Sequence, residues 1–251
     1  MKIWVDRQLV DSSPDYLDGA GWPLGTGIFE TLRTENGSVQ LLARHMRRAI
    51  TSARELKLSI PDEGLISDAI HELLMATPHE VGRLRLSFSN QRFIATHESY
   101  EISQSPYSVI VSRGLNATVG RQHKVFPYSS RLSLLQEAKA VGCDEVIILD
   151  SNDRVCEGAV SNYAFRIQDQ WMTPPITAGI LPGVIRALAI ERCEVVVRDL
   201  SRSDIASCQS AIALSSLKIA SPITSIDGRI LAIDSDVSDI CSKLHLLAST
   251  L

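Results

Sequence analysis

A lysine and a glutamate, each at the border of a predicted element, are the residues best suited to carry out chemistry in this chain. Lys124 stands a few residues before a helical pattern at about 130–141. Glu157 follows the apolar run 146–149 and a turn at 150–153. A lysine amine forms an imine when it is neutral part of the time, and burial lowers its pKa toward that range. This order allows the amine and the carboxylate to approach one small molecule from opposite sides.

Two other lysines are rivals for this role. Lys139 lies inside the predicted helix, and Lys218 follows the pair Ser215-Ser216. Neither has the spacing to Glu157 that Lys124 has. The plain alternative for Lys124 is a surface lysine in a loop that enters a helix.

Four blocks of sequence occur in a characteristic order along the chain. They are Gly25–Thr31, His45–Arg48, the long stretch Lys124–Asn162, and Gly179–Arg186 preceded by Thr173-Pro174. Together they resemble the fold-type IV pyridoxal-phosphate enzymes, the class-IV aminotransferase family, and within it aminodeoxychorismate lyase most of all. The resemblance implies an α/β fold of the α+β type with two domains, pyridoxal 5′-phosphate as cofactor, and a homodimer.

The resemblance also implies a role for each matching residue. Lys124 would be the Schiff-base lysine, Glu157 would keep the pyridine nitrogen protonated, and Tyr128 would contact the ring or its 3-oxygen. Arg48 would bind the phosphate, because a guanidinium fork suits a dianion, although a solvated helix face is the plain alternative. The other cofactor-binding residues implied are Ser161, Asn162, Val184, Ile185 and Ser216, with Val184 and Ile185 acting through main-chain N–H groups at a helix start.

Three arginines are candidates for binding a substrate carboxylate. Residues 81–88 alternate strictly between apolar and polar, so Arg83 and Arg85 share one face of a predicted strand. Arg92 follows in the next loop. The alternative is a sheet with one solvated face. The glycines of Gly25–Gly27 are better explained by a structural role than by phosphate binding, because no Gly-Lys-Ser/Thr follows them.

The pattern of the chain predicts two α/β domains. Asn36-Gly37 between apolar runs predicts a hairpin over 28–42, and helices are expected at 45–58 and 61–76. The periodicity breaks near 113–121. We therefore expect an N-terminal domain at 1–113, a linker at 114–121, and a C-terminal domain at 122–251 that carries Lys124.

Composition excludes several classes of function. A net charge of -4 gives no general basic footprint, so nucleic acid is not expected as a partner. The five cysteines are odd in number and form no Cys-x-x-Cys pair, which favours reduced thiols in a cytoplasmic protein over disulfides or a metal site. No apolar run approaches the length of a membrane span, and no signal-peptide core is expected.

The resemblance leaves the outcome of the reaction open. The blocks ending at Arg33 and Arg186 favour a 4-amino-4-deoxychorismate lyase, which eliminates pyruvate and leaves 4-aminobenzoate for folate synthesis. Residues 89–93 differ from the loop that lyases of the family often carry. A class-IV aminotransferase for D- or branched-chain amino acids is the alternative, and a non-catalytic descendant that binds the cofactor is a more remote one.

Overall fold

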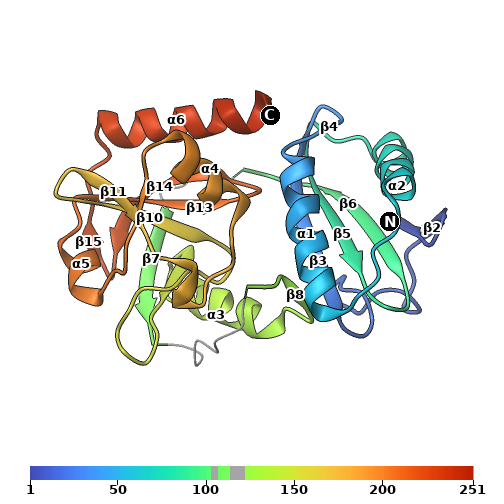
Figure 1. Cartoon of the computed structure of the whole chain (residues 1–251), viewed down its shortest axis with the longest axis horizontal. Coiled ribbons are helices and arrows are strands. Elements are labelled where there is room, and N and C mark those ends of the chain that lie inside the picture. The colour runs from blue at the N-terminus through green and yellow to red at the C-terminus, as the bar shows by residue number, and fades with distance from the viewer. Residues whose placement is uncertain (103–106, 114–121, 251) are drawn as a thin grey trace. The chain divides into compact units, whose positions relative to one another are not determined.

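The computed structural model describes residues 1–102, 107–113 and 122–250, and divides the chain into two compact units (Figure 1). The first unit comprises Met1–Ile102 with His123–Tyr128, and the second comprises Ser103–Gln122 with Ser129–Leu251. Each unit has its own sheet and its own helices. The expected α+β fold with two domains is confirmed.

The first unit is built on an antiparallel sheet of 7 strands. Its order is β2-β1-β6-β5-β3-β4, and β8 pairs with the beginning of β3. The strands are β1 (Lys2–Val5), β2 (Gln8–Asp11), β3 (Gly27–Glu35), β4 (Ser38–Val39), β5 (Val81–Phe88), β6 (Phe93–Ser99) and β8 (Val125–Phe126). The predicted hairpin is confirmed, because Asn36 and Gly37 both take the positive φ that such a tight turn requires.

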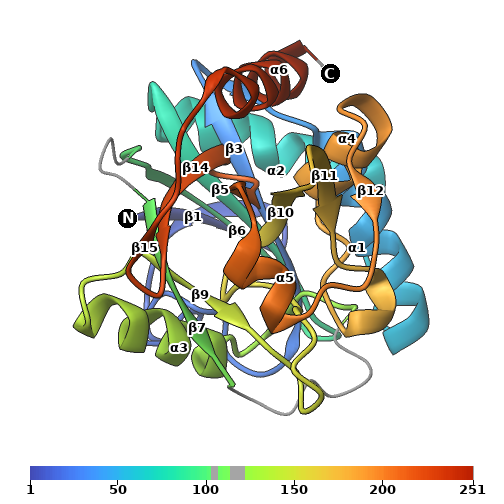
Figure 2. The same cartoon turned by 90° about the vertical axis from the view of Figure 1, so that its left-hand side faces the viewer.

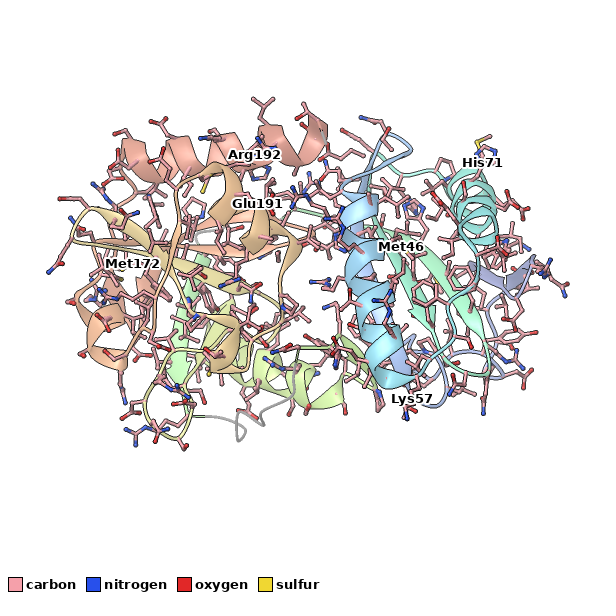
Figure 3. All side chains as sticks on the ribbon, in the orientation of Figure 1. Met46, Lys57, His71, Met172, Glu191 and Arg192 are labelled. Atoms are coloured by element: carbon pink, nitrogen blue, oxygen red, sulfur yellow. The ribbon has the colours of Figure 1, made fainter. Side chains whose placement is uncertain are left out.

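Two helices pack on this sheet, α1 (Leu42–Leu56) against β3 and α2 (Glu63–Ala76) against β6 and β1. Met46, near the beginning of α1, and Lys57, just past its end, are labelled in Figure 3. The side chain of Asp62 accepts a hydrogen bond from the Leu65 amide and begins α2. Ala49 and Ala53 of α1 bury their small side chains in the same core as Leu84 and Phe88 of β5.

The second unit is built on a mixed sheet of 8 strands in the order β12-β11-β10-β13-β14-β7-β9, with β15 paired to β14. Three pairs are parallel, β11 with β12, β14 with β7, and β7 with β9. The strands are β7 (Tyr107–Ser112), β9 (Glu145–Ile148), β10 (Asn162–Ile167), β11 (Gln170–Thr173), β12 (Val196–Val197), β13 (Ser210–Ser215), β14 (Ile219–Ile226) and β15 (Arg229–Ile230).

Four helices and one 3-10 turn complete the second unit. They are α3 (Ser129–Ala140), α4 (Val184–Arg192), α5 (Arg202–Ser207), α6 (Ser235–Thr250) and η1 (Ile176–Ala178). α6 packs on β14 and α4 packs on β13. α3 lies beside β9, as Figure 2 shows from the side. In the described residues, no helix is long and apolar enough to cross a membrane.

The two units differ from the expected domains at their borders. The expected linker, 114–121, lies outside the described residues. Residues His123–Tyr128 belong with the first unit, because β8 pairs with Gly27 and Ile28 of β3. Lys124 therefore lies in the first unit rather than in the C-terminal domain, where the local pattern had placed it.

Candidate active site

Lys124 is held at the edge of the first sheet by its own backbone. Its carbonyl accepts a hydrogen bond from the Phe29 amide at 2.8 Å, and β8 then continues the pairing with β3. A side chain at position 27 would collide with this arrangement, because an added Cβ would lie 2.2 Å from the Phe88 carbonyl and 2.7 Å from the Phe126 ring. Gly27 thus has the structural role expected for it.

The amine of Lys124 lies against aromatic rings. Its Nζ is 4.5 Å from the centroid of Phe29 and 5.0 Å from that of Tyr128. Trp22 completes this aromatic group, with its ring centroid 4.8 Å from Phe29 and 5.8 Å from Tyr128. The lysine amine therefore has an apolar wall beside it, supplied by three separate segments of the first unit.

Arg85 lies at the edge of the same aromatic group. Its guanidinium carbon is 4.0 Å from the centroid of Trp22, and Nη1 donates to the Gly21 carbonyl at 3.1 Å. Its Nε is buried, and no hydrogen-bond partner for it occurs in the part of the chain that the structure describes. Burial lowers the pKa of Arg85 to about 10, and the neighbouring Arg83 adds to this effect. The guanidinium still carries its charge at neutral pH.

The other two arginines are placed differently. Arg83 forms an ion pair with Glu98 across the β5–β6 register. Arg92 is exposed in the loop between these strands, where its guanidinium carbon lies 5.0 Å from the centroid of Tyr16. Of the three candidates for binding a carboxylate, the structure brings Arg85 to the aromatic group of Lys124.

Arg48 belongs to a buried charge cluster on the α1 side of the first sheet. Its Nε and Nη2 donate to the two oxygens of Glu30 at 2.8 and 2.5 Å, and His45 contacts Glu30 at 2.7 Å through Nδ1. Burial alone would raise the pKa of Glu30, but the charge of Arg48 and the bonds from both partners lower it to about 2. Burial lowers the pKa of the His45 ring, and the hydrogen bond and charge of Glu30 oppose this shift.

In the second unit, Glu157 is a buried carboxylate with several partners. Arg131 of α3 donates from Nη2 to Oε1 at 2.5 Å, and from Nη1 to the Gly158 carbonyl at 2.8 Å. Oε2 of Glu157 accepts from the Asn162 side chain at 3.2 Å and from the Leu181 amide at 2.9 Å. Because the guanidinium adjoins it, the carboxylate is stabilised in its ionised form.

The start of α4 lies beside Asn162. Gly183 is the N-cap residue, and a Cβ at this position would lie 1.8 Å from Oδ1 of Asn162. Val184 and Ile185 are buried in the first turn, where helix amides lack intrahelical acceptors and favour an anion. Register places Ser216 at the same end of the sheet, since Asn162 pairs with Leu214 and Ser216 begins the turn after β13.

Sequence reasoning missed three contacts among these residues. Arg131 donates to Glu157, but it lies in a helix whose polar residues do not gather on one face, so its sequence context did not single it out. The hydrogen bonds from Arg48 to Glu30 join α1 to β3, and no local sequence pattern indicates such a contact. Ser161, expected to brace the cofactor, donates its hydroxyl to Glu145 at 3.2 Å. In the described residues, no group of His, Cys, Asp or Glu could hold a metal ion.

Comparison with known proteins establishes the family. The chain matches the amino-transferase class IV family over residues 27–226. A bifunctional aminodeoxychorismate lyase / D-amino acid transaminase from Mycobacterium tuberculosis is 26% identical over 240 residues, 82% of this chain and 83% of that protein. A structure of a hypothetical aminotransferase from Mycobacterium tuberculosis in its PLP-bound form has a TM-score of 0.85 at 22% identity, covering 99% of both chains. A branched-chain amino acid aminotransferase from Escherichia coli has a TM-score of 0.83 at 21% identity, covering 98% of this chain and 94% of that one.

The chain therefore belongs to the amino-transferase class IV family, and its fold is that of the fold-type IV pyridoxal-phosphate enzymes. It is a pyridoxal-phosphate enzyme, either a lyase or an aminotransferase. The donor groups present fit this cofactor, since Lys124 supplies an amine, Glu157 an ionised carboxylate, and the start of α4 main-chain amides.

Proposed function

We propose that this protein is a 4-amino-4-deoxychorismate lyase that releases pyruvate and 4-aminobenzoate for folate synthesis. The observation that carries the proposal is the aromatic group of Trp22, Phe29 and Tyr128 beside Lys124, with Arg85 at its edge. The substrate is a six-membered ring with carboxylates. The ring becomes flat and aromatic in the product 4-aminobenzoate, and a flat ring packs well on aromatic side chains. A guanidinium pairs with a carboxylate.

The residues around the proposed reaction have distinct tasks. Lys124 removes a proton from the ring carbon that bears the amino group. As the C–O bond to the enolpyruvyl group breaks, the same amine returns a proton to the departing group, which leaves as pyruvate. Pyridoxal phosphate, when bound, supplies an electron sink for the charge left by the proton.

The cofactor-binding roles are part of the proposal. Glu157, ionised beside Arg131, holds the proton on the pyridine nitrogen, and Asn162 bonds to that carboxylate. Tyr128 packs near Lys124 and contacts the cofactor ring. The phosphate is assigned to a larger set of groups, namely the amides of Val184 and Ile185, Ser216, and the guanidinium of Arg48. Ser161 supports the cofactor side.

A class-IV aminotransferase is the second candidate. Of the three candidate arginines, only Arg85 lies at the aromatic group, whereas Arg92 lies over Tyr16. A single cation at this place suits a substrate with one carboxylate, which favours the aminotransferase. The lyase relative named above also carries the name D-amino acid transaminase. Both activities use the same lysine and the same carboxylate.

A product assay separates the two candidates. The purified protein is incubated with 4-amino-4-deoxychorismate, and separately with D-alanine or L-leucine plus 2-oxoglutarate, while 4-aminobenzoate and glutamate are measured. The lyase proposal requires 4-aminobenzoate at a rate that Lys124→Ala abolishes and that Lys139→Ala, a change of an exposed lysine in α3, preserves. Glutamate alone would establish the aminotransferase. Neither product would favour a non-catalytic protein.

We also propose a homodimer in the cytoplasm. The family resemblance supports the dimer, and the five free thiols suit a reducing compartment. Light scattering after gel filtration would give a mass near twice the 27.5 kDa of the chain. A monomer mass at micromolar concentration would contradict the dimer.

A further inference from the structure

Glu145, at the beginning of β9, is a fully buried carboxylate that neither the sequence motifs nor the proposed mechanism uses. Its side chain is 0% exposed. It forms no ion pair with any described residue of the chain. An unpaired buried carboxylate is costly, so the contacts that satisfy it need a reason.

The partners of Glu145 come mainly from one turn. Oε1 accepts from the amides of Val146 at 3.1 Å and Ala159 at 2.9 Å. Oε2 accepts from the Val160 amide and the Ser161 hydroxyl, each at 3.2 Å. Successive amides that converge on one anion form a nest, and here the anion is a side chain of the same protein. We call residues Gly158–Ser161 the 158–161 turn.

Packing around Glu145 holds the turn at a short distance. A Cβ at Gly158 would lie 3.1 Å from the carboxyl carbon of Glu145 and 2.9 Å from the hydroxyl oxygen of Tyr163. That hydroxyl donates to the Val146 carbonyl at 2.8 Å. Glycine is therefore needed for the turn to approach β9 closely enough to bond to Glu145.

The turn connects two residues that contact each other. Glu157 precedes it and Asn162 follows it, and the Asn162 side chain donates to Oε2 of Glu157. The turn is closed by the Gly158 amide, which donates to the Ser161 carbonyl at 2.7 Å. The position of the Glu157 carboxylate therefore depends on the conformation of the turn.

We propose that Glu145 is a positioning residue for Glu157. Its carboxylate holds the 158–161 turn in the one conformation that brings the side chains of Asn162 and Glu157 together. The proposal rests on the proposed function in one respect, the role of Glu157 toward the pyridine nitrogen. Burial raises the pKa of Glu145, and the hydrogen bonds that its carboxylate accepts oppose this shift. The carboxylate oxygens therefore serve as hydrogen-bond acceptors for the turn.

The first measurement needs no cofactor. Hydrogen exchange of the apo protein is followed for peptides covering 158–162 in the wild type, in Glu145→Gln and in Ile205→Val. Glu145→Gln keeps the size of the side chain but turns an N–H₂ group toward hydrogen-bond donors. Exchange in the turn should become about tenfold faster, the effect of losing one hydrogen bond. Ile205→Val trims a buried residue of α5 and should lower the melting temperature without changing exchange in the turn.

The second measurement uses the holoenzyme. The pH dependence of its visible absorbance band is compared for the wild type, Glu145→Gln and Glu157→Gln. A positioning role predicts that Glu145→Gln shifts the pH midpoint in the same direction as Glu157→Gln, and by a smaller amount.

The outcomes separate the two proposals. Unchanged exchange in the turn, or faster exchange spread evenly over the second unit, overturns the positioning role of Glu145. A shifted midpoint for Glu157→Gln with an unshifted one for Glu145→Gln also overturns it, and leaves the role of Glu157 intact. If Glu157→Gln itself leaves the midpoint unchanged, the role of Glu157 in the proposed function fails, and the exchange experiment still decides whether Glu145 holds the turn.

Discussion

Replacing Glu30 with glutamine tests the buried charge cluster of the first unit. The carboxyl has a pKa lowered from 4.5 to about 2, because Arg48 and His45 outweigh the cost of burial. A shift of this size corresponds to about 3 kcal/mol of stability at neutral pH. The variant also leaves the buried guanidinium of Arg48 without its carboxylate. We expect a loss of about 3 kcal/mol in the free energy of unfolding at pH 7.

The pH dependence gives the sign of the effect. A carboxyl whose pKa is lowered in the folded state contributes stability that is fully present above the unfolded value of 4.5 and is lost as pH falls through the folded value of about 2. The difference between wild type and Glu30→Gln should therefore be smaller by about 1 kcal/mol at pH 4 than at pH 7.

The assay is urea unfolding of the apo protein followed by tryptophan fluorescence, since Trp4 and Trp22 both lie in the first unit. Glu98→Gln is the matched control, because it breaks a Glu–Arg pair on the same sheet whose partners are about a third exposed, and should cost at most about 1 kcal/mol. Adding Arg48→Met to Glu30→Gln should recover part of the loss. An equal loss for Glu30→Gln and Glu98→Gln, or a loss independent of pH, would refute the reasoning.

Three further changes test the site. Arg131→Met removes the guanidinium beside buried Glu157 and should cost about 3–5 kcal/mol in urea unfolding of the apo protein, and a change below about 1 kcal/mol would contradict the pairing. Gly183→Ala places a Cβ 1.8 Å from Oδ1 of Asn162 and should cost about 1–3 kcal/mol, measured in the same way, whereas wild-type stability would show that the loop can move aside. Arg85→Met should raise KM for 4-amino-4-deoxychorismate by about 10-fold or more while kcat changes little, and an unchanged KM would remove Arg85 from the substrate site.

Local patterns predicted the elements of this fold well. The Asn36-Gly37 hairpin and the strict alternation in β5 follow from backbone conformation and from burial on one face, both of which a short stretch of sequence encodes. The helix expected at 45–58 is α1, which begins three residues earlier because Leu41 takes a left-handed conformation and ends the preceding turn.

Local sequence patterns could not predict contacts between segments that are far apart in the chain. Nothing near Lys124 indicates that β8 pairs with β3, about a hundred residues earlier, which moves the lysine to the first unit. Glu145 reads as one more residue of an extended run, yet it is fully buried. The roles expected for Lys124 and Glu157 rest on the order of the sequence blocks. The hydrogen bonds of Arg131 and Glu145 join distant segments, so they are seen only in the folded chain.

The pairing of β8 with β3 also has a consequence for synthesis on the ribosome. The first sheet needs a strand that is made only after Ser103–Gln122, a segment of the second unit. Until residue 126 has emerged, the edge of β3 at Gly27 and Ile28 has no β8 to cover it. Exposed strand edges attract other chains, so the nascent protein passes through an interval in which its first unit is open to aggregation or to binding by a chaperone. The same dependence means that a fragment ending at Ile102 would lack both this strand and the lysine.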